Sequence, residues 1–439
     1  MSAFIEPRIL KGFRDFLPAG EIVRRNLEEK IEASFRSYGF VPIDTPALEY
    51  AEILLGKGGG ETEKQVYRFK DNGDRDVALR FDLTVPFARF LAEHRAELTF
   101  PFKRYHIAKV WRGENTQRGR YREFTQCDFD TVGSDSAAAD FEILHIMRNI
   151  LRTAARGDVS IHINHRGLFN RFLSRIGVLE ASDGAISADI LRTVDKLAKI
   201  GKEETLKLLS ASVGDGKARE ILDFIGIEGG FDETLAAMTR AAGAGPESER
   251  LRLIRCFMND AGIADSFVLD PSITRGLDYY TGVVFESFLS DMPGIGSVCS
   301  GGRYDNLVGL YTKNKNPSES LSGVGASLGI DRLIAGLEAL GRLETELSYA
   351  RIAIACVSEA SGGAYQALAE TLRKEGIPCE VFLEEEKLTK QFQLAEKKGL
   401  RWLIIPDSET SPALTLRDLA KRENHEGLKT EEIIAILKK

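Results

Sequence analysis

The segment from Arg104 to Asp130 constrains the fold more than any other part of the sequence. Two stretches in it, Tyr105–Trp111 and Phe124–Asp130, have the residue types of half-buried strands, and a loop rich in arginine and glycine joins them. In a hairpin of this kind, alternate side chains of both strands lie on one face of a sheet. The sequence therefore predicts an antiparallel hairpin with one polar face.

The polar side chains of this hairpin indicate what the face could bind. Arg112 follows the first strand and Phe124 opens the second, while Gln126, Asp128 and Asp130 continue at a spacing of two. A guanidinium, a flat aromatic ring and a row of polar groups suit a nucleotide and a small polar ligand. The loop adds three further arginines, which suit a larger polyanion: Arg118, Arg120 and Arg122.

Composition narrows the classes of protein to which the chain can belong. A chain of 439 residues should form two or three domains, and 43% hydrophobic and 28% charged residues are ordinary for a globular protein. The net charge is −7, so nucleic-acid contacts must use local basic clusters, because salt confines electrostatic fields to roughly 8 Å.

Neither a membrane span nor a metal site made of histidines or cysteines is expected. No apolar run approaches the roughly 20 residues that span a bilayer, and the N-terminus lacks the plan of a signal peptide. Five scattered cysteines without a CxxC pair indicate a reducing compartment, so a cytoplasmic location is predicted. His162 and His165 are the closest pair of histidines, but they lack further clustered ligands.

The residue pattern changes along the chain and predicts an α+β protein. Alternation of strand and helix near the C-terminus indicates a small α/β domain with a mostly parallel sheet. The predicted domains are a strand-rich core at residues 1–167, a helical insertion at 168–262, a return of the core at 263–335, a linker at 336–349 and the α/β domain at 350–439.

The usual phosphate-binding loops are missing from the sequence. It has no GxxxxGK[ST] motif and no GxGxxG between a strand and a helix, and the glycines at 56–60 favour a mobile flap over a phosphate cradle. Side-chain arginines on a sheet must then hold any nucleotide. The candidates are Arg112, Arg275 and Arg332.

The segment LRFDLTVPFARF has the character of a binding site rather than a core. Asp82 and Thr84 are two residues apart, so both would face the same side of a strand just before its helix. Both residue types also cap helices, and that interpretation is equally open from the sequence alone.

Two glycine-containing segments, TRGLDYYTGVVFE and SGGRYDNLVGLY, are further site candidates. Tyr279 and Tyr280 are adjacent, and adjacent residues of a strand point to opposite faces, so at most one should line a given pocket. Gly301 and Gly302 would allow a ligand to approach the backbone closely, although a turn is the commoner reason for such a pair.

Together with KGFRDFLP, GVGASLGIDRL and EEEKLTKQFQLAEKKG, these segments resemble histidyl-tRNA synthetase, a class II aminoacyl-tRNA synthetase, over essentially the whole chain. The resemblance implies a class II antiparallel-sheet catalytic core with a helical insertion and a C-terminal anticodon-binding domain. It implies ATP with Mg²⁺, L-histidine and tRNA(His) as ligands. It also implies a homodimer through motif 1, the helix at 19–38 and the proline-bearing strand Phe40–Leu48.

The resemblance assigns roles at the nucleotide. Arg112 would clamp the α-phosphate, Glu114 would meet the adenine edge and Phe124 would stack on its face. Arg332 would hold the far end of the triphosphate, and Arg275 would contact the reacting carboxylate and the α-phosphate. Arg112 and Arg275 are thus the implied catalytic residues. The loop arginines would lie near the tRNA acceptor end: Arg118, Arg120 and Arg122.

The resemblance also assigns a histidine pocket. Asp82, Thr84 and Gln126 match ligands of the α-amino group, and Asp130 with Tyr280 matches the pair that grips the imidazole. Some members carry glutamate in place of Asp82 and Asp130. Three further residues complete the implied pocket: Tyr279, Gly301 and Tyr304.

Two other functions are compatible with parts of the sequence. One is a synthetase-like regulatory subunit of ATP phosphoribosyltransferase in histidine biosynthesis, and the other is a noncatalytic RNA-binding module. The site arginines and the C-terminal domain favour the enzyme. That domain has a predicted basic patch for anticodon bases, or a solvated helix face, made of Lys387, Lys390, Lys397, Lys398 and Arg401.

Overall fold

The chain divides into two compact units, which are described here one at a time. The computed structural model describes residues 4–56, 61–155, 157–178, 184–274, 279–312, 321–406 and 413–438. The first unit comprises Met1–Arg14 and Leu27–Arg342, and the second comprises Asp15–Asn26 and Leu343–Lys439. In the described parts of the chain, no helix has the length and apolar character needed to cross a membrane.

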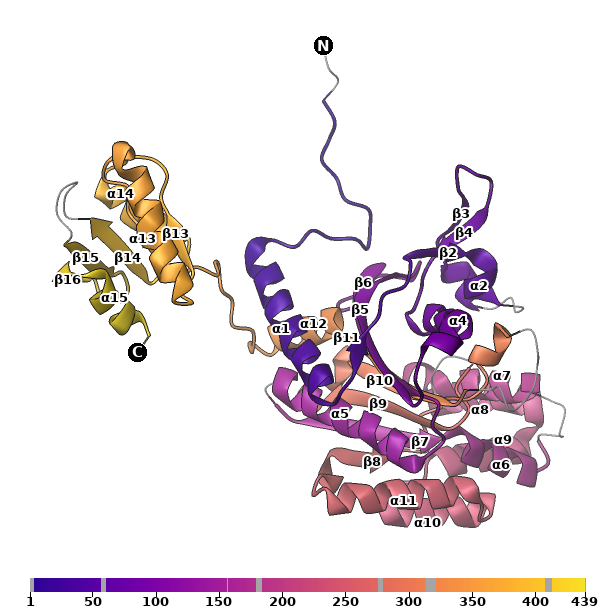
Figure 1. The fold of residues 1–439 in the computed structure, drawn as a ribbon. Helices are drawn as coiled ribbons and strands as arrows, with labels where there is room; N and C mark the ends of the chain where they lie inside the picture. Colours follow the sequence, from indigo (N-terminus) through magenta and orange to yellow (C-terminus); the bar gives the residue numbers. More distant parts are fainter. Residues whose placement is uncertain are drawn as a thin grey trace. The chain divides into compact units, whose positions relative to one another are not determined.

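An eight-stranded sheet forms the centre of the first unit (Figure 1). Its neighbours pair antiparallel, except for β1 with β5 at one edge and β7 with β8 at the other. The predicted α+β class and the predicted hairpin, which is β5–β6, are confirmed. In spatial order the strands are β1 (Val41–Pro42), β5 (Phe102–Trp111), β6 (Glu123–Val132), β11 (Gly323–Gly329), β10 (Cys299–Tyr304), β9 (Val283–Leu289), β7 (Val159–His165) and β8 (Phe267–Leu269).

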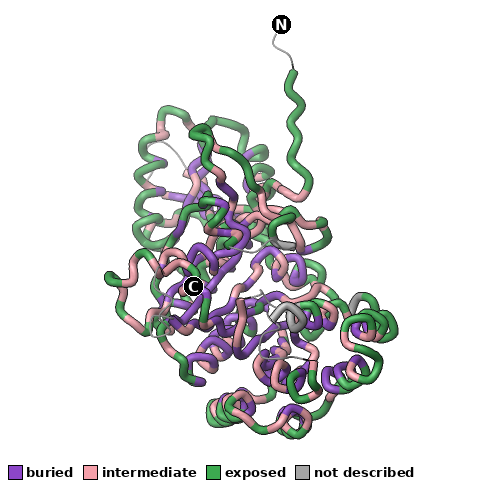
Figure 2. Tube along the Cα trace, turned by 90° about the vertical axis from the view of Figure 1, so that its right-hand side faces the viewer, coloured by how far each residue is buried: buried purple, intermediate pink, exposed green. Residues whose placement is uncertain are grey.

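The hairpin separates an apolar face from a polar face by simple alternation. Tyr105 and Phe129 oppose each other and lie against Phe35 of α1 (Pro18–Ser37), with ring centroids 5.4 and 4.9 Å away. Burying each such ring contributes roughly 1.5–3 kcal/mol. The next pair in register, Arg104 with Asp130, lies on the other face. Both strands contain buried residues, and β6 is buried over most of its length. In Figure 2, buried segments (purple) run through the interior and most exposed segments (green) lie outside them.

Two more helices, α5 (Ala137–Ala155) and α12 (Ile330–Ala339), pack on the sheet (Figure 1). Helix α5 contacts β6, β7 and β11, and α12 contacts β6. Ile143, Met147 and Ile150 of α5 are buried at the spacing of one helical face. Helical cover on the apolar face leaves the polar face of the hairpin available for a binding site.

A small three-stranded sheet stands beside the main one. It has the order β2 (Leu48–Tyr50), β4 (Asp76–Leu79), β3 (Arg68–Lys70), with α2 (Ala51–Leu55), α3 (Glu61–Gln65) and α4 (Thr84–His94) next to it in the chain. The predicted strand at Phe40–Leu48 is wrong in extent, because only Val41–Pro42 pairs with β5. The pairing residues Val41–Pro42 lie at an edge of the sheet, where a proline without an N–H is tolerated.

The helical stretch predicted at 168–262 belongs to the same compact unit as the sheet. A buried charge cluster joins it to the core: the carboxylate of Asp140 on α5 accepts hydrogen bonds from Arg250 at 2.6 Å and from Arg303 of β10 at 2.8 Å. The helices are α6 (Arg166–Arg175), α7 (Gly184–Asp195), α8 (Leu197–Val213), α9 (Asp215–Ile225), α10 (Phe231–Ala242) and α11 (Pro246–Asp260).

The second unit contains a five-stranded sheet that differs from its prediction. β12 pairs parallel with β13 and β14, but β14, β15 and β16 pair antiparallel, so the sheet is mixed rather than mostly parallel. β16 is largely exposed and polar, so it gave no apolar signal. The elements are β12 (Ile352–Ile354), α13 (Gly362–Lys374), β13 (Cys379–Val381), α14 (Leu388–Lys397), β14 (Trp402–Pro406), β15 (Leu414–Asp418), β16 (Glu423–Leu428) and α15 (Thr430–Leu437).

Candidate functional site

The polar face of the β5–β6 hairpin holds several buried polar atoms that have no hydrogen-bond partner among the described residues. They include Nη1 of Arg104, Nδ1 of His106, Oε1 of Gln126 and Oδ1 of Asp128. Buried polar groups in folded proteins are nearly always hydrogen-bonded, so each exception needs an explanation. Their concentration on one sheet face indicates a place where a polar ligand completes the bonding.

Asp130 is at the centre of a buried hydrogen-bonded group. Its carboxylate lies 2.7 Å from Nη2 of Arg104 and accepts a hydrogen bond from the Tyr304 hydroxyl at 2.7 Å. Glycines on the neighbouring strand make the room: a Cβ on Gly325 would lie 2.0 Å from Asp130, and one on Gly323 would lie 2.5 Å from the Tyr304 ring. The GVG pattern thus accommodates two of the predicted site residues.

Asp82 and Thr84 reach the same cluster from the start of α4. Oδ1 of Asp82 accepts the backbone N–H of Val85 at 3.1 Å, so the capping interpretation holds for this residue. Asp82 is also completely buried, and the Tyr279 hydroxyl lies 3.5 Å from its Oδ2. The Thr84 hydroxyl lies 3.5 Å from Oδ2 of Asp128. Capping and site contacts are therefore combined in one turn.

Tyr279 and Tyr280 correct a geometric prediction. They precede β9 and are not in a strand, so alternation does not separate them. Their rings meet edge to face with centroids 5.0 Å apart, and Tyr279 is also edge to face with Tyr304 at 6.0 Å. Arg166, the first residue of α6, donates to the Tyr280 carbonyl at 2.8 Å. Both tyrosines lie beside the carboxylates.

Gly301 and Gly302 are inside β10 rather than in a turn. A Cβ on Gly301 would lie 2.1 Å from the carbonyl oxygen of Gly325 on β11, and one on Gly302 would lie 2.8 Å from the carbonyl oxygen of Val283 on β9. Close packing between strands therefore already explains both glycines. The role of Gly301 at a ligand stays a prediction.

Burial dominates the electrostatics of the acidic cluster. It raises the pKa of Asp82 to about 6, against the opposing effect of Arg112 and Arg104. It raises the pKa of Asp128 to about 7, with Arg104 opposing and Asp130 adding to the rise. The pKa of Asp130 is raised for the same reason, with Arg104 opposing. Water is largely excluded from these carboxylates, which strengthens their interaction with any cation.

Arg112 and Phe124 are adjacent where β5 enters the loop at residues 112–122 and β6 leaves it. This partly exposed end of the hairpin is called the open end. The Arg112 guanidinium lies 5.2 Å from the centroid of the Phe124 ring, and its Nε donates to the carbonyl oxygen of Phe81 at 2.8 Å. The hydrogen bond holds the guanidinium between the hairpin and the turn that carries Asp82. A planar cation beside an aromatic face can accommodate a phosphate and a base.

Arg332 lies close enough to this group to interact with it. Burial lowers the pKa of Arg332, and the positive charges of Arg120 and Arg112 lower it further, while Glu114 and Glu286 oppose them. Two of the three predicted nucleotide arginines thus lie near one another, and their mutual repulsion would be relieved by a polyanion. The third, Arg275, lies outside the described residues.

The loop arginines make local contacts. Nη1 of Arg120 bonds Oε2 of Glu114 at 3.2 Å, and Nε of Arg122 donates to the Glu114 carbonyl at 3.2 Å. Arg118 is exposed and lies 3.9 Å from Glu338. Arg120 and Arg122 therefore shape the loop around Glu114, and Arg118 is the one that extends into solvent.

Sequence reasoning missed four residues of the site or its support. Asp331 of α12 accepts the backbone N–H of Thr125 at 2.7 Å and pairs with Arg14, whose guanidinium lies 3.7 Å from the centroid of the Tyr121 ring. The other two are Arg104 and Ser327. Register could have found Arg104, since it opposes Asp130, but no pattern in the sequence marked Ser327, which accepts a hydrogen bond from Gln126 at 2.6 Å.

The two closest histidines have local structural contacts. Nδ1 of His162 lies 2.7 Å from Oδ2 of Asp270, and Nδ1 of His165 accepts the backbone N–H of Gly167 at the start of α6. Among the residues that the structure describes, no group of three or more His, Cys, Asp and Glu side chains could hold a metal ion.

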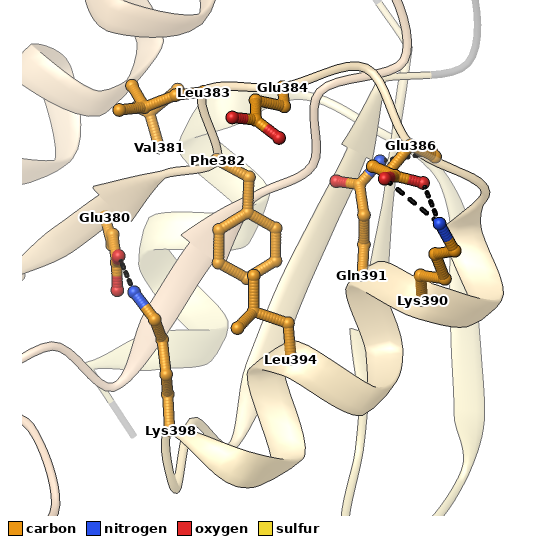
Figure 3. Close-up of a pocket in the computed structure, with 10 residues that line it drawn as sticks. All are labelled: Glu380, Val381, Phe382, Leu383, Glu384, Glu386, Lys390, Gln391, Leu394 and Lys398. Atoms are coloured by element: carbon orange, nitrogen blue, oxygen red, sulfur yellow. Dashed lines mark hydrogen bonds and ion pairs between the residues drawn. The ribbon is translucent and has the colours of Figure 1, made fainter.

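The second unit contains a cavity of about 410 Å³ between the end of β13 and α14. Phe382 and Leu394 line it, as Figure 3 shows. The predicted basic patch is partly compensated there, because Lys390 pairs with Glu386 at 2.8 Å and Lys398 pairs with Glu380. Charge alone therefore gives this surface little attraction for phosphates.

Comparison with known proteins agrees with both units. A family model described as histidyl-tRNA synthetase matches residues 12–333, and one described as anticodon-binding domain matches residues 351–439. A Treponema denticola protein named histidine–tRNA ligase is 54% identical over 418 residues, which cover 93% of this chain and 91% of the relative.

Solved structures give the same picture. The crystal structure of histidyl-tRNA synthetase from Nostoc sp. PCC 7120 has a TM-score of 0.85 and 31% identity, and the match covers 99% of both chains. A Bacillus halodurans protein described as an ATP phosphoribosyltransferase regulatory subunit/histidyl-tRNA synthetase has a TM-score of 0.73 over 92% of this chain and 100% of that one, but its 20% identity shows the fold alone. From the family-model match and the full-length relatives, the chain belongs to the histidyl-tRNA synthetase family.

Proposed function

We propose that the chain is a histidine–tRNA ligase. It activates L-histidine with ATP to give histidyl-adenylate and pyrophosphate, and then transfers histidine to the 3′-terminal ribose of tRNA(His). The observation that carries this proposal is the adjacency of two sites on one hairpin. Buried carboxylates surround Asp130, and arginines near Arg112 and Arg332 lie at the open end.

Activation brings two anions together. A carboxylate oxygen of histidine attacks the α-phosphorus, and pyrophosphate leaves with the electrons of the broken P–O bond. Holding the reactants in line can supply roughly 7–11 kcal/mol. Arg112 and, by the family resemblance, Arg275 would neutralise the charge that develops on the α-phosphate, and arginine suits this because its planar fork makes two aligned bonds.

The nucleotide would lie over the open end of the hairpin. Phe124 would stack on adenine, Glu114 would meet the base edge and Arg332 would hold the terminal phosphates. The proximity of Arg112, Arg120 and Arg332 supports this arrangement, since their mutual repulsion makes a polyphosphate a favourable partner.

Mg²⁺ fits the donors that lie beside these arginines. Magnesium at nucleotide sites is held by one or two carboxylates together with phosphate oxygens, so a protein cage is unnecessary. Glu286, which is buried and interacts electrostatically with Arg332, is a carboxylate of the required kind. The ion would supply positive charge to the phosphate oxygens.

Histidine would lie deeper on the same face. Asp82, Thr84 and Gln126 would bind the α-amino group, while Asp130 and Tyr280 would bind the imidazole. Two buried acceptor oxygens without partners in the described residues, Oε1 of Gln126 and Oδ1 of Asp128, support this placement, because the cationic or donor end of a ligand would satisfy them. A site that hydrogen-bonds both imidazole nitrogens should reject analogues that lack them by roughly 10⁴–10⁵.

The tRNA would contact both units. Arg118, Arg120 and Arg122 would lie near the acceptor end, and the residues matched by the anticodon-binding model would read anticodon bases. An unpaired base would enter the cavity and stack on the ring of Phe382, which lines it. Base stacking on an aromatic ring contributes roughly 1–3 kcal/mol. Phe382→Ala should then slow charging while pyrophosphate exchange is unaffected.

A homodimer through α1 and β1 is part of this proposal. Val41, Leu48, Tyr50 and Phe69 are large apolar side chains that stay exposed on β1 and the small sheet. Clustered exposed apolar residues mark interaction surfaces. Analytical ultracentrifugation of the full chain should give twice the monomer mass, and a monomer at micromolar concentration would contradict this part. The reaction and its tRNA substrate make the cytoplasm the proposed location.

The deciding experiment is histidine-dependent exchange of pyrophosphate into ATP. Purified, folded chain should catalyse exchange with L-histidine and with no other standard amino acid, and should then charge tRNA(His). Absence of exchange would refute the proposal and leave the fold available for a noncatalytic regulatory role.

A further inference from the structure

One carboxylate in the pocket has no role in the proposed function, on which the following inference rests. We propose that Asp128 is a third acidic recognition residue that binds the α-ammonium of histidine together with Asp82 and releases a proton to solvent when that cation arrives. The residue lies between Gln126 and Asp130 on the polar face of β6.

Position supports this assignment first. Asp128 is 1% exposed, and its Oδ1 has no hydrogen-bond partner within the described residues. Its Oδ2 lies 3.5 Å from the Thr84 hydroxyl. In register it lies opposite Ser327, whose hydroxyl accepts from Gln126 at 2.6 Å and also hydrogen-bonds the Asp128 carboxylate. Two proposed ammonium ligands, Thr84 and Gln126, are therefore on either side of this carboxylate.

The charge balance supports it second. Three carboxyl groups, Asp82, Asp128 and Asp130, face one another, but only Asp130 has an ion pair within 4 Å in the described part of the chain, with Arg104. Buried carboxyl groups without a cation favour the protonated form. The α-ammonium is the positive charge that a bound amino acid brings. At the end of the pocket with Asp82 and Thr84, the described residues form no ion pair with a carboxylate, although Arg112 lowers the pKa of Asp82.

β11, which pairs with β6 beside Asp128, contributes only neutral groups, and the other elements around Asp128 contribute charged or titratable ones. These groups are Arg80 and Asp82 before α4, Arg104 and His106 on β5, Asp130 on β6, Tyr279 and Tyr280 before β9, and Cys299 on β10. Burial lowers the pKa of His106 to about 4 and raises that of both tyrosines and the cysteine, so these four groups are neutral near pH 7. The three carboxyl groups, Asp82, Asp128 and Asp130, are the groups able to change charge there, and Asp130 is the one paired with Arg104.

The consequence is a measurable proton. Burial raises the pKa of Asp128 to about 7, so roughly half of the free protein carries a proton there at pH 7. An ammonium in direct contact lowers the pKa of a carboxyl group and expels that proton. Histidine affinity should then rise between pH 6 and pH 7.5.

The experiment is calorimetric titration of the full chain at pH 7 in phosphate and in Tris, whose ionisation enthalpies differ. The two ligands are L-histidine and 3-(imidazol-4-yl)propionate, which keeps the imidazole and the carboxylate but lacks the amino group. L-Histidine should release about half a proton more than the analogue. Equal proton release by the two ligands would overturn the proposal, and this result needs no variant.

Variants locate the effect at Asp128. Asp128→Asn should raise the KM for histidine in pyrophosphate exchange about 10- to 100-fold, change kcat less than threefold and remove most of the extra proton release. Binding of the analogue should change little. Asp128→Glu, which keeps the charge, should recover part of the affinity. Cys127→Ser, the adjacent residue on the opposite face of β6, is the control for disturbance of the strand.

Each outcome has a defined meaning. If Asp128→Asn weakens histidine and the analogue by the same factor, Asp128 does not act on the ammonium and the inference is wrong. Unchanged KM and proton release in Asp128→Asn would likewise refute it. Wild-type protein that binds histidine with the expected proton release but shows no exchange would refute the proposed function and leave the role of Asp128 intact.

Discussion

The two ends of the β5–β6 hairpin hold charge in opposite ways. The end away from the loop at residues 112–122 is called the closed end, because protein surrounds it. There the Arg104–Asp130 pair is buried, and both side chains are at most 3% exposed. At the open end, Arg120 and Glu114 form a longer contact of 3.2 Å, and their side chains are 38% and 24% exposed. The same two strands therefore place charges in two different dielectric environments.

This difference indicates that one end of the hairpin is suited to recognising a ligand and the other to neutralising negative charge. Buried charges are strongly coupled, so their pKa values move and the loss of one partner leaves the other uncompensated. Half-exposed charges are screened by water and salt, so their effect on a ligand depends on how many of them contact it and how they are arranged. The closed end is suited to selecting one small polar ligand, and the open end is suited to holding a flexible polyanion.

The largest expected effect tests the buried pair. Asp130→Asn leaves the Arg104 guanidinium buried without its counter-charge, which should lower the free energy of unfolding by about 3–5 kcal/mol. Urea denaturation measures this. Asp76→Asn, which breaks a contact of 2.9 Å with Arg68 between exposed strands, is the control and should have a much smaller effect. Similar losses for both variants would remove the distinction between the two ends.

The next effect tests neutralisation at the open end. Arg112→Ala should reduce the rate of pyrophosphate exchange about 10²- to 10³-fold, because a preorganised donor to the developing charge is lost. Stability should change little, since the guanidinium is only partly buried. Arg152→Ala, an exposed arginine of α5, serves as control. Near-normal exchange by Arg112→Ala would show that this arginine does not contact the reacting phosphate.

The free energy of unfolding should depend on pH because of the buried carboxyl groups at the closed end. Burial raises the pKa of Asp82 to about 6 and that of Asp128 to about 7, so the folded protein binds protons more tightly than the unfolded chain. Stability from these groups is present below pH 4 and is lost as pH rises to about 7, by up to about 1.4 kcal/mol per pH unit for each group. Comparing urea denaturation of wild type and Asp128→Asn between pH 5 and 7.5 isolates one group. An identical slope in the variant would contradict the shift.

The smallest effect concerns the exposed loop. Arg118→Ala should leave the free energy of unfolding within about 0.5 kcal/mol of wild type, as expected for a surface residue. If Arg118 contacts a tRNA phosphate, the variant should bind tRNA more weakly and its affinity should depend less steeply on salt, by about one unit of the log–log slope. Filter binding at several salt concentrations measures this, and an unchanged slope would exclude a phosphate contact.

Local patterns predicted a large part of the fold. The hairpin was predictable because residue types alternate over both strands, and the helical character of residues 168–262 was predictable from the change of residue pattern there. The strand at Phe40–Leu48 was overextended, because pairing depends on a partner strand that local sequence does not contain. The C-terminal sheet was predicted to be mostly parallel because β16, which pairs antiparallel with β15, is exposed and its residues lack an apolar pattern.

Parts of the site needed tertiary structure. Spacing alone placed Asp128 on the polar face with Asp130, but only the register of three strands shows that Arg104 lies opposite Asp130 and that Asp128 lies opposite Ser327. Tyr279 and Tyr280 were expected on opposite faces, but they lie outside a strand. The roles of Arg275 and of the loop at 56–60 stay predictions, because Arg275 and residues 57–60 lie outside the described residues.

The sequence by itself determined which chemical groups are available and which elements carry them. Alternation and helical spacing are properties of neighbouring residues, so they can be read without a structure. Tertiary structure alone decided which charges are buried together, because burial depends on elements that are distant in the chain. Asp82, Asp128 and Asp130 acquire their raised pKa values only when α4, β5 and β11 exclude water around them.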